Sequence, residues 1–312
     1  MKYDLAPELS KLSIRRSPSN IYVYPFVNIL FGNPRFKSDD SVIVKKLKIK
    51  SFDGHKLNNF IIEPRDSKDD LPCIVFFHGG GFLLKAAKSH CEIAKEYAKT
   101  ADCKVIFADY RLMPKYRFPF ALKDSYHLYN HILKNADKLN IDKDKIVLAG
   151  DSAGANIAIS ITLKMINEGA FLPKGEILIY PVTDRRMQYG SMKRYTDTPV
   201  WDSKVNEVFW REYLKFASPN DMKYASPMEA ESFKGFPDTY IEVAEFDCLH
   251  DEGIAFAKRL ESEGIPVEYN EIKGTCHGFE AEPESSIVRD AMKRRTEWMN
   301  DLFSQEIHDN GS

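Results

Sequence analysis

Residues 146–154 of this 312-residue chain read I-V-L-A-G-D-S-A-G, an apolar run that leads directly into the pentapeptide G-x-S-x-G. In this setting Ser152 is predicted to lie on a tight turn between a strand and a helix, where Gly150 and Gly154 relieve crowding. The turn would expose the hydroxyl at the carboxyl edge of a sheet, beside a helix N-terminus that favours negative charge. The alternative is a glycine-rich turn with a capping serine, so the interpretation depends on the other elements.

The sequence around this stretch alternates short apolar runs with helical periodicity from about residue 75 onward. Continuous apolar runs are typical of strands buried on both faces, and this alternation predicts an α/β fold, a parallel sheet with helices on both faces. The predicted strands are Cys73–Phe77, Val105–Ala108, Lys145–Ala149, Ile177–Tyr180, Thr239–Ala244 and Val267–Ile272. The predicted helices are Lys88–Thr100, Phe120–Leu139, Ala153–Ile166 and a segment that contains Ile254–Leu260.

Two details concern the carboxyl-terminal part of this pattern. Val267–Ile272 is more polar than the other predicted strands, so we expect it at an edge of the sheet. The last helix carries Ile287, Ala291, Trp298 and Phe303 near helical spacing, and its charged residues are expected to face outward.

Two segments depart from the alternation. Residues 1 to about 40 are predicted to form short helices that are broken at Pro7, Pro18, Pro25 and Pro34. Residues 184–224 form a long connection, rich in aromatic and charged residues, and a connection of that length is usually functional or a small subdomain. After the first segment, Val42–Ile49 and Leu57–Ile62 predict an antiparallel hairpin that turns at Asp53-Gly54.

The composition argues against several classes of protein. The 44 basic and 46 acidic residues give a formal charge of −2, which disfavours a general binder of nucleic acids. No apolar run approaches the ~20 residues of a membrane-spanning helix, because Pro25 and Asn28 interrupt the longest one, Ile21–Phe31. The N-terminus lacks the order of a signal peptide, so we expect a cytoplasmic protein without stable membrane insertion. The five cysteines form no C-x-x-C pair, which predicts reduced thiols and no metal site.

A second motif, H-G-G-G-F, begins at His78 and directly follows a predicted strand. Acyl transfer needs backbone N–H donors aimed at the oxygen that becomes negative in the tetrahedral intermediate. We predict the amides of Gly80, Gly81 and Ala153 as these donors, and we expect His78 and Gly79 to order the loop. A flexible loop or a phosphate cradle is the alternative, but no G-K-[ST] follows, which disfavours the phosphate cradle.

A serine hydroxyl is a weak nucleophile without a base, and the best base in the sequence is His277. It follows the last predicted strand, at the carboxyl edge where open α/β sheets place their sites. A carboxylate must hold the tautomer of that base, and Asp247 follows the preceding strand. Competing carboxylates are Glu245, Asp251 and, within the strand, Glu242. The order Ser152, Asp247, His277 is expected of an α/β-hydrolase, and this chemistry needs no metal or organic cofactor.

With these motifs the sequence resembles the hormone-sensitive-lipase-like family of α/β-hydrolases, which includes bacterial acetyl esterases and carboxylesterases. The matching segments are H-G-G-G-F (78–82), D-Y-R-L (109–112), G-D-S-A-G-A-N (150–156), Y-P (180–181), D-C-L-H-D-E (247–252) and H-G-F (277–279). The resemblance implies an α/β-hydrolase fold with a mostly parallel sheet of about eight strands, helices on both faces and a helical cap. It implies Ser152 as the nucleophile, Asp247 and His277 as its partners, and Gly80, Gly81 and Ala153 as the oxyanion hole.

The resemblance also implies a division of the chain. Residues 1–40 and 184–224 would form the cap, residues 41–183 and 225–308 the catalytic domain, and residues 309–312 a tail. Two positions depart from the family pattern, with Lys115 where a carboxylate is usual and Cys248 where a proline is usual. These departures leave loop packing and substrate preference open. Cys248 and Cys276 adjoin the predicted triad, which gives the hypothesis that their oxidation lowers activity.

Three functions are compatible with these residues. The first is a serine carboxylesterase that hydrolyses small, short-acyl esters through an acyl-enzyme on Ser152. An amidase or formamidase would use the same triad, because both reactions pass through the same kind of acyl-enzyme. A non-catalytic ligand receptor on the same scaffold is disfavoured, because His277 is present in its expected motif. A small-molecule ester is the expected partner, and a homodimer is left open.

Overall fold

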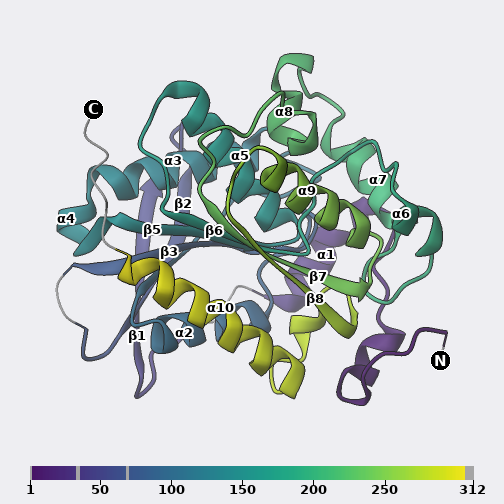
Figure 1. Cartoon of the computed structure of the whole chain (residues 1–312), viewed down its shortest axis with the longest axis horizontal. Helices are drawn as coiled ribbons and strands as arrows, with labels where there is room; N and C mark the ends of the chain where they lie inside the picture. Colours follow the sequence, from purple (N-terminus) through teal and green to yellow (C-terminus); the bar gives the residue numbers. More distant parts are fainter. Residues whose placement is uncertain (1, 33–35, 68–69, 306–312) are drawn as a thin grey trace.

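The computed structural model describes residues 2–32, 36–67 and 70–305, and its centre is an eight-stranded sheet (Figure 1). The strands lie in the order β1-β2-β4-β3-β5-β6-β7-β8, and β2 alone in this described sheet runs antiparallel to its neighbours. Their bounds are β1 Val42–Lys50, β2 Lys56–Pro64, β3 Leu71–Phe77, β4 Lys104–Phe107, β5 Ile141–Asp151, β6 Gly175–Ile179, β7 Asp238–Phe246 and β8 Val267–Cys276. The mostly parallel sheet, the β1–β2 hairpin and the edge position of the polar strand β8 are therefore confirmed.

Helices cover both faces of the sheet, as the sequence predicts. The helices α2 and α10 lie on one face, and α3, α5 and α9 lie on the other (Figure 1). Their bounds are α2 Lys88–Thr100, α3 Phe120–Lys134, α5 Ala153–Glu168, α9 His250–Ser262 and α10 Ser286–Ser304. In β3, Ile74 and Phe76 pack toward α2 and α10, whereas Val75 and Phe77 pack toward the opposite helices. Burial on both faces explains why this strand is apolar over consecutive positions.

Two helices differ from their predictions. The helix expected over Phe120–Leu139 ends at Lys134, and a separate α4 (Ala136–Leu139) follows. The backbone of Asn135 has φ −124° and ψ 20°, outside the helical region, and asparagine has a low helix propensity because its side chain competes for backbone hydrogen bonds. In α10 the expected outward placement of charged residues is wrong for Arg295, which is fully buried.

The N-terminal segment forms η1 (Pro7–Ile14), η2 (Ile21–Val23) and α1 (Tyr24–Phe31). Pro7 and Pro25 lie in the first turns of η1 and α1, so they begin helices instead of breaking them. The first turn of a helix tolerates proline because the missing N–H would have no partner within the helix. Pro34 lies outside the described residues, as does the predicted tail at 309–312.

The second irregular segment joins β6 to β7. It contains α6 (Gly190–Arg194), α7 (Ser203–Tyr213), η3 (Pro219–Asp221), α8 (Met222–Ala225) and η4 (Pro227–Glu229). The carboxylate of Asp202 caps α7, because it accepts from two backbone amides at 3.0 Å. The aromatic face of α7, with Phe209, Trp210 and Tyr213, is buried.

The two irregular segments contact each other and the loop that follows the glycine motif. The amide of Val200 donates to the carbonyl of Arg15 at 2.9 Å, and Arg16 forms an isolated parallel bridge with Val200. From α1, the Asn28 side chain donates to the carbonyl of Leu83 at 2.7 Å. These contacts agree with a shared cap, although the division of the chain into cap and catalytic domain stays a prediction.

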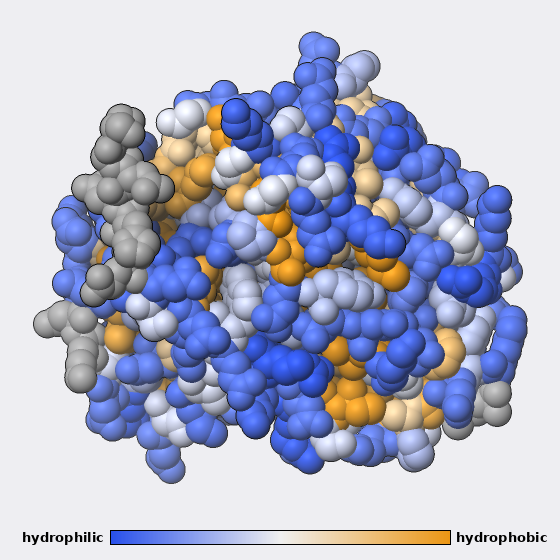
Figure 2. Space-filling model, in the orientation of Figure 1, coloured by the Kyte–Doolittle hydropathy of each residue, from blue (hydrophilic) through white to orange (hydrophobic). Residues whose placement is uncertain are grey.

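The visible surface of the molecule is mostly hydrophilic, and its hydrophobic residues occur in small separate groups (Figure 2). In α1, Phe26, Ile29 and Leu30 are exposed. None of the described helices combines the length and the hydrophobicity that crossing a membrane requires.

Candidate active site

Ser152 lies on a sharp turn between β5 and α5. Its backbone has φ 54° and ψ −115°, a left-handed conformation that costs free energy for a residue with a side chain. Close packing explains the flanking glycines: a Cβ at Gly154 would lie 1.9 Å from the carbonyl oxygen of Phe77, and one at Gly150 would lie 2.4 Å from the backbone of Gly154. The amide of Ser152 donates to the carbonyl of Ile179 at 2.8 Å, which fixes the turn to β6.

His277 and Asp247 are brought to Ser152 by the ends of two neighbouring strands. Phe246 of β7 pairs with Cys276 of β8, so the residues that follow these two start side by side. The Nε2 atom of His277 lies 2.9 Å from the Oγ of Ser152, and its Nδ1 lies 2.6 Å from the Oδ2 of Asp247. A carboxylate only accepts, so Nδ1 donates to Asp247 and Nε2 is free to accept from the serine hydroxyl. All three side chains are buried.

The competing carboxylates are engaged elsewhere. Glu245 accepts from the amide of Gly274 at 2.8 Å, and Asp251 accepts from the amide of Ser191 at 2.8 Å. Glu242 lies in β7 and pairs with Arg295. Among the carboxylates of the described chain, Asp247 is the one in contact with a nitrogen of His277.

The glycine loop lies beside the Ser152 turn. Gly80 and Gly81 have φ of 105° and 62°, conformations that residues with a Cβ rarely adopt. The amide of Gly79 donates to the Oδ1 of Asp151 at 2.8 Å, which ties the loop to the turn. Within the described residues, the amides of Gly80, Gly81 and Ala153 have no protein acceptor, so they are available to a ligand oxygen.

His78 has the surroundings of a residue that orders the loop. Its Nδ1 donates to the carbonyl of Gly79 at 2.7 Å, and its ring stacks on Tyr110 at 4.6 Å between centroids. The hydroxyl of Tyr110 donates to the His78 carbonyl. Burial lowers the pKa of His78 to about 4, so the imidazole is neutral near pH 7.

Sequence reasoning missed His90 at the start of α2. Its Nδ1 accepts from the amide of Ala87 at 2.9 Å, and its Nε2 faces the Oδ2 of Asp151 at 3.3 Å. Asp151 therefore receives donors from both Gly79 and His90. The sequence does place Asp151 beside the nucleophile, where a buried carboxylate needs donors, but nothing in it indicates that His90 is one of them.

Aromatic side chains wall the site on the side of α7. Trp201 contacts Gly81, since a Cβ there would lie 2.7 Å from the indole Cη2, and its ring centroid lies 6.1 Å from that of His277. Phe82 stacks on Tyr213 of α7 at 4.2 Å between centroids. A ligand at Ser152 would therefore meet flat apolar surfaces supplied by the 184–224 segment.

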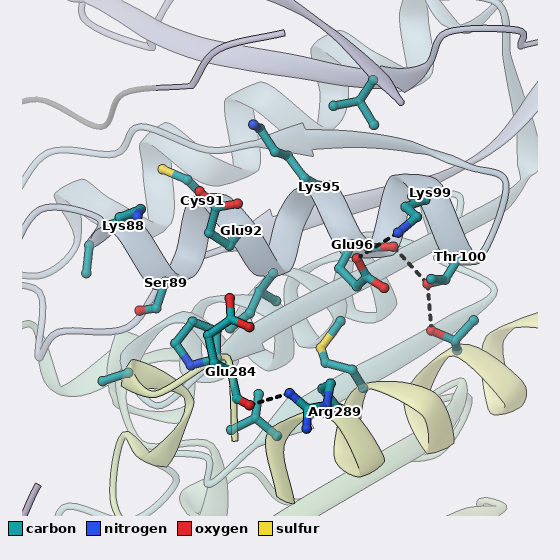
Figure 3. A pocket seen from close by; sticks show the side chains of 18 of the residues that line it. Lys88, Ser89, Cys91, Glu92, Lys95, Glu96, Lys99, Thr100, Glu284 and Arg289 are labelled. Atoms are coloured by element: carbon teal, nitrogen blue, oxygen red, sulfur yellow. Dashed lines mark hydrogen bonds and ion pairs between the residues drawn. The ribbon is translucent and has the colours of Figure 1, made fainter. Parts of the chain in front are cut away.

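A groove of about 1220 Å³ lies elsewhere, between α2 and α10 (Figure 3). Of its 24 described lining residues 11 are charged, and six of these form ion pairs with one another: Lys95–Asp39 at 2.9 Å, Lys99–Glu96 at 3.7 Å and Lys293–Glu297 at 3.7 Å. None of the three triad candidates lines it. This groove is therefore not the site that the sequence predicts.

The cysteines lie in surroundings that favour neither a redox pair nor a metal site in the described structure. All five cysteines are free and buried, and burial raises the pKa of Cys248 far above its usual range and that of Cys276 to about 12. These two thiols belong to different hydrophobic cores, which weakens the hypothesis of a redox pair. In the part of the chain that the structure describes, no cluster of three or more His, Cys, Asp or Glu could hold a metal ion.

Comparison with known proteins gives consistent matches. A family model described as alpha/beta hydrolase fold matches residues 74–281. Ethyl acetate hydrolase from Pseudomonas putida is 28% identical over 246 residues, which cover 78% of this chain and 77% of the relative. Esterase LipI from Mycobacterium tuberculosis is 31% identical over 67% of this chain and 66% of its own length. The solved structure of a bacterial heroin esterase superposes with a TM-score of 0.86 at 26% identity, covering 97% of this chain and 99% of that one.

Proposed function

Because the chain belongs to the hormone-sensitive-lipase-like family of α/β-hydrolases, we propose that it is a serine carboxylesterase that hydrolyses small, short-acyl esters. The observation that carries the proposal is the continuous chain of hydrogen bonds from Ser152 through His277 to Asp247. The names of the relatives, ethyl acetate hydrolase and esterase, support ester hydrolysis as the reaction class.

The first half of the reaction forms an acyl-enzyme. The Oγ of Ser152 attacks the acyl carbonyl while the Nε2 of His277 accepts its proton, and Asp247 stabilises the imidazolium that results. The tetrahedral intermediate then collapses, and the alcohol leaves with the proton from His277. In the second half, water attacks the acyl group with the same base, which releases the acid and restores Ser152.

The oxyanion is stabilised by amides that are already in place. Gly80, Gly81 and Ala153 offer N–H groups that have no acceptor in the described part of the chain, and Ala153 begins α5, whose N-terminus favours negative charge. Removing one donor of this kind typically costs about 10²- to 10³-fold in kcat. Asp151 and His78 take no part in the reaction steps. They hold the loop in the conformation that presents these amides.

The short-acyl preference rests on the aromatic wall. Trp201 lies against Gly81, and Phe82, the residue after Gly81, stacks on Tyr213, so we expect these rings to limit the depth of the acyl pocket. We propose that residues 1–40 and 184–224 together form the cap that carries this wall, and that residues 41–183 and 225–308 form the catalytic domain. The contact between Arg15 and Val200 supports a cap made from both segments.

The test is hydrolysis of p-nitrophenyl esters from acetate to palmitate by the wild type and by Ser152→Ala. We expect rates that peak at short chains and fall by about 10⁶-fold in the variant, as when a serine nucleophile is removed from a triad. Ser89→Ala is the matched control, since Ser89 lines the groove between α2 and α10 and should leave the rate unchanged.

Other outcomes would redirect the proposal. A peak at long chains would keep the triad and overturn the short-acyl preference. An amidase would be favoured if Ser152 were needed to hydrolyse the corresponding anilides while no ester were hydrolysed in a Ser152-dependent way. Unchanged ester turnover in Ser152→Ala would overturn the proposed nucleophile.

A further inference from the structure

A buried ionic cluster lies between α10 and the sheet, and the proposed reaction does not use it. Arg295 of α10 is fully buried and donates to Glu242 of β7 and to Glu280 of η5 (Phe279–Ala281). Three tyrosines complete this Arg295 cluster: Tyr240 donates to Glu242 at 2.7 Å, Tyr180 donates to Glu280 at 2.6 Å, and the hydroxyl of Tyr97 in α2 accepts from Arg295 at 3.4 Å. Buried ion pairs of this kind often stabilise a fold no more than apolar residues of the same volume would. Its position therefore calls for another explanation.

One end of the cluster reaches the proposed base. Glu280 lies three residues after His277, in the short helix that directly follows it. Tyr180, which binds Glu280 through its hydroxyl, places its ring 4.6 Å from the imidazole of His277, at an angle of 58° between the ring planes. The ring of Tyr180 thus contacts the imidazole of His277, and its hydroxyl binds η5, the segment that follows His277.

The hydrogen bond to Asp247 restrains the imidazole only partly. The ring turns about the χ1 and χ2 bonds of His277, and a hydrogen bond tolerates small displacements, so a slight tilt can move Nε2 away from Ser152 while the bond from Nδ1 to Asp247 persists. Packing against an aromatic ring restrains such a tilt. In the described chain, the other aromatic contact of His277 is Trp201, which is more distant, at 6.1 Å.

We propose that Tyr180 is a positioning residue, which sets the tilt of the His277 imidazole and is itself held by the Glu280 carboxylate that Arg295 anchors. The inference rests on the proposed function, in which His277 is the general base. It assigns the buried Arg295 cluster a role in catalysis that acts through geometry, since none of its charged groups touches Ser152 or the oxyanion amides.

The cluster contains its own control. Tyr240 makes the same kind of bond as Tyr180, from its hydroxyl to a glutamate that Arg295 holds. Its ring packs on Trp298 of α10 at 5.9 Å between centroids and not on His277. Removal of either hydroxyl should therefore perturb the same buried charges, whereas only removal of the Tyr180 hydroxyl should free a ring that contacts the base.

The experiment compares Tyr180→Phe with Tyr240→Phe in the full chain, by kcat and KM on p-nitrophenyl acetate and by thermal unfolding. We expect similar losses of thermal stability in both variants. In Tyr180→Phe, kcat should fall between about 5- and 50-fold at constant KM, less than the ~10²-fold that a 1 Å misplacement can cost. In Tyr240→Phe, kcat should stay within about twofold of the wild type, because the geometry of the base is untouched.

Equal kcat in Tyr180→Phe and wild type would overturn the inference, and so would equal losses of kcat in the two variants. A rise in KM at constant kcat would also overturn it, because Tyr180 would then be a wall of the substrate pocket. If Tyr180→Phe does not fold, Glu280→Gln with Glu242→Gln as its control gives the same comparison. Ser152→Ala is assayed in parallel: full activity there overturns the proposed function, whereas an inactive Ser152→Ala beside a normal Tyr180→Phe overturns only this inference.

Discussion

The groove between α2 and α10 and the site around Ser152 differ in character. The groove has a volume of about 1220 Å³, and some of its charged side chains pair with one another along regular helices (Figure 3). The site around Ser152 is closed, with Ser152 only 4% and His277 only 5% exposed. Yet the closed site holds the strained backbone and the amides that have no acceptor among the described residues. We therefore take the convergence of unsatisfied groups, and not volume, as the guide to the proposed active site.

The difference has a physical basis in how each region is stabilised. A non-glycine residue in a left-handed conformation, such as Ser152 at φ 54°, costs on the order of 1–3 kcal/mol and persists only where the surroundings enforce it. Here the amide bond to Ile179 and the close contact of Gly154 with Phe77 enforce it. The walls of the groove are ordinary helices that need no such support.

The largest difference in activity between a change at the Ser152 site and a change in the groove is expected for Asp247→Asn. If the asparagine amide donates to Nδ1 of His277, the neutral imidazole carries its proton on Nε2. In that tautomer Nε2 can no longer accept the proton of Ser152. Loss of the carboxylate in a triad costs about 10⁴-fold in kcat. The measurement is kcat on p-nitrophenyl acetate, with folding checked by circular dichroism.

Glu284→Gln is the matched control, because it removes a carboxylate from the groove. We expect it to keep the activity of the wild type. Comparable losses in the two variants, or a fully active Asp247→Asn, would contradict the assignment of chemistry to the closed site.

The sequence predicts most of the closed site because its elements are local. The pentapeptide around Ser152 carries its own turn, and the predicted ends of β7 and β8 place Asp247 and His277 at one edge. The edge position of β8 follows from its polar residues. These inferences need only periodicity and the rule that parallel strands end together.

What the sequence could not predict depends on contacts between distant segments. His90 begins an ordinary amphipathic helix, and its partner Asp151 is 61 residues away. Arg295 is one of several charged residues in α10, and only the packed structure shows that it faces Glu242 and Glu280. The break at Asn135 escaped prediction because asparagine also occurs inside the helices of this chain, as Asn130 does in α3.

A second, smaller effect is expected in the pH dependence of stability. Burial lowers the pKa of His78 to about 4, below its ordinary value of 6.5. The unfolded chain therefore takes up a proton at this residue as pH falls below about 6.5, while the folded protein does not until about pH 4. The native state should lose about 2 kcal/mol of its unfolding free energy through His78 between pH 7.5 and pH 5.

Urea unfolding of the wild type and of His78→Asn at the two pH values measures this contribution. Asparagine keeps a donor near the position of Nδ1 but cannot titrate, so the difference between the two pH values should shrink by that amount. His127→Gln removes an exposed histidine and serves as the control. An unchanged pH difference in His78→Asn would show that the closed site does not cause the acid sensitivity.

The smallest effect concerns the aromatic wall, which distinguishes a closed acyl pocket from a merely buried serine. The indole of Trp201 lies where a Cβ at Gly81 would point, so Trp201→Ala should open space beside the oxyanion loop. Two further methylenes buried there, at ~0.8 kcal/mol each, would raise kcat/KM for the octanoate ester relative to the acetate ester about tenfold. Trp298→Ala removes an indole from α10 on the other side of the sheet, and it should lower stability without changing this ratio. A ratio that changes equally in both variants would mean that general loosening, and not the wall at Trp201, limits the length of the acyl chain.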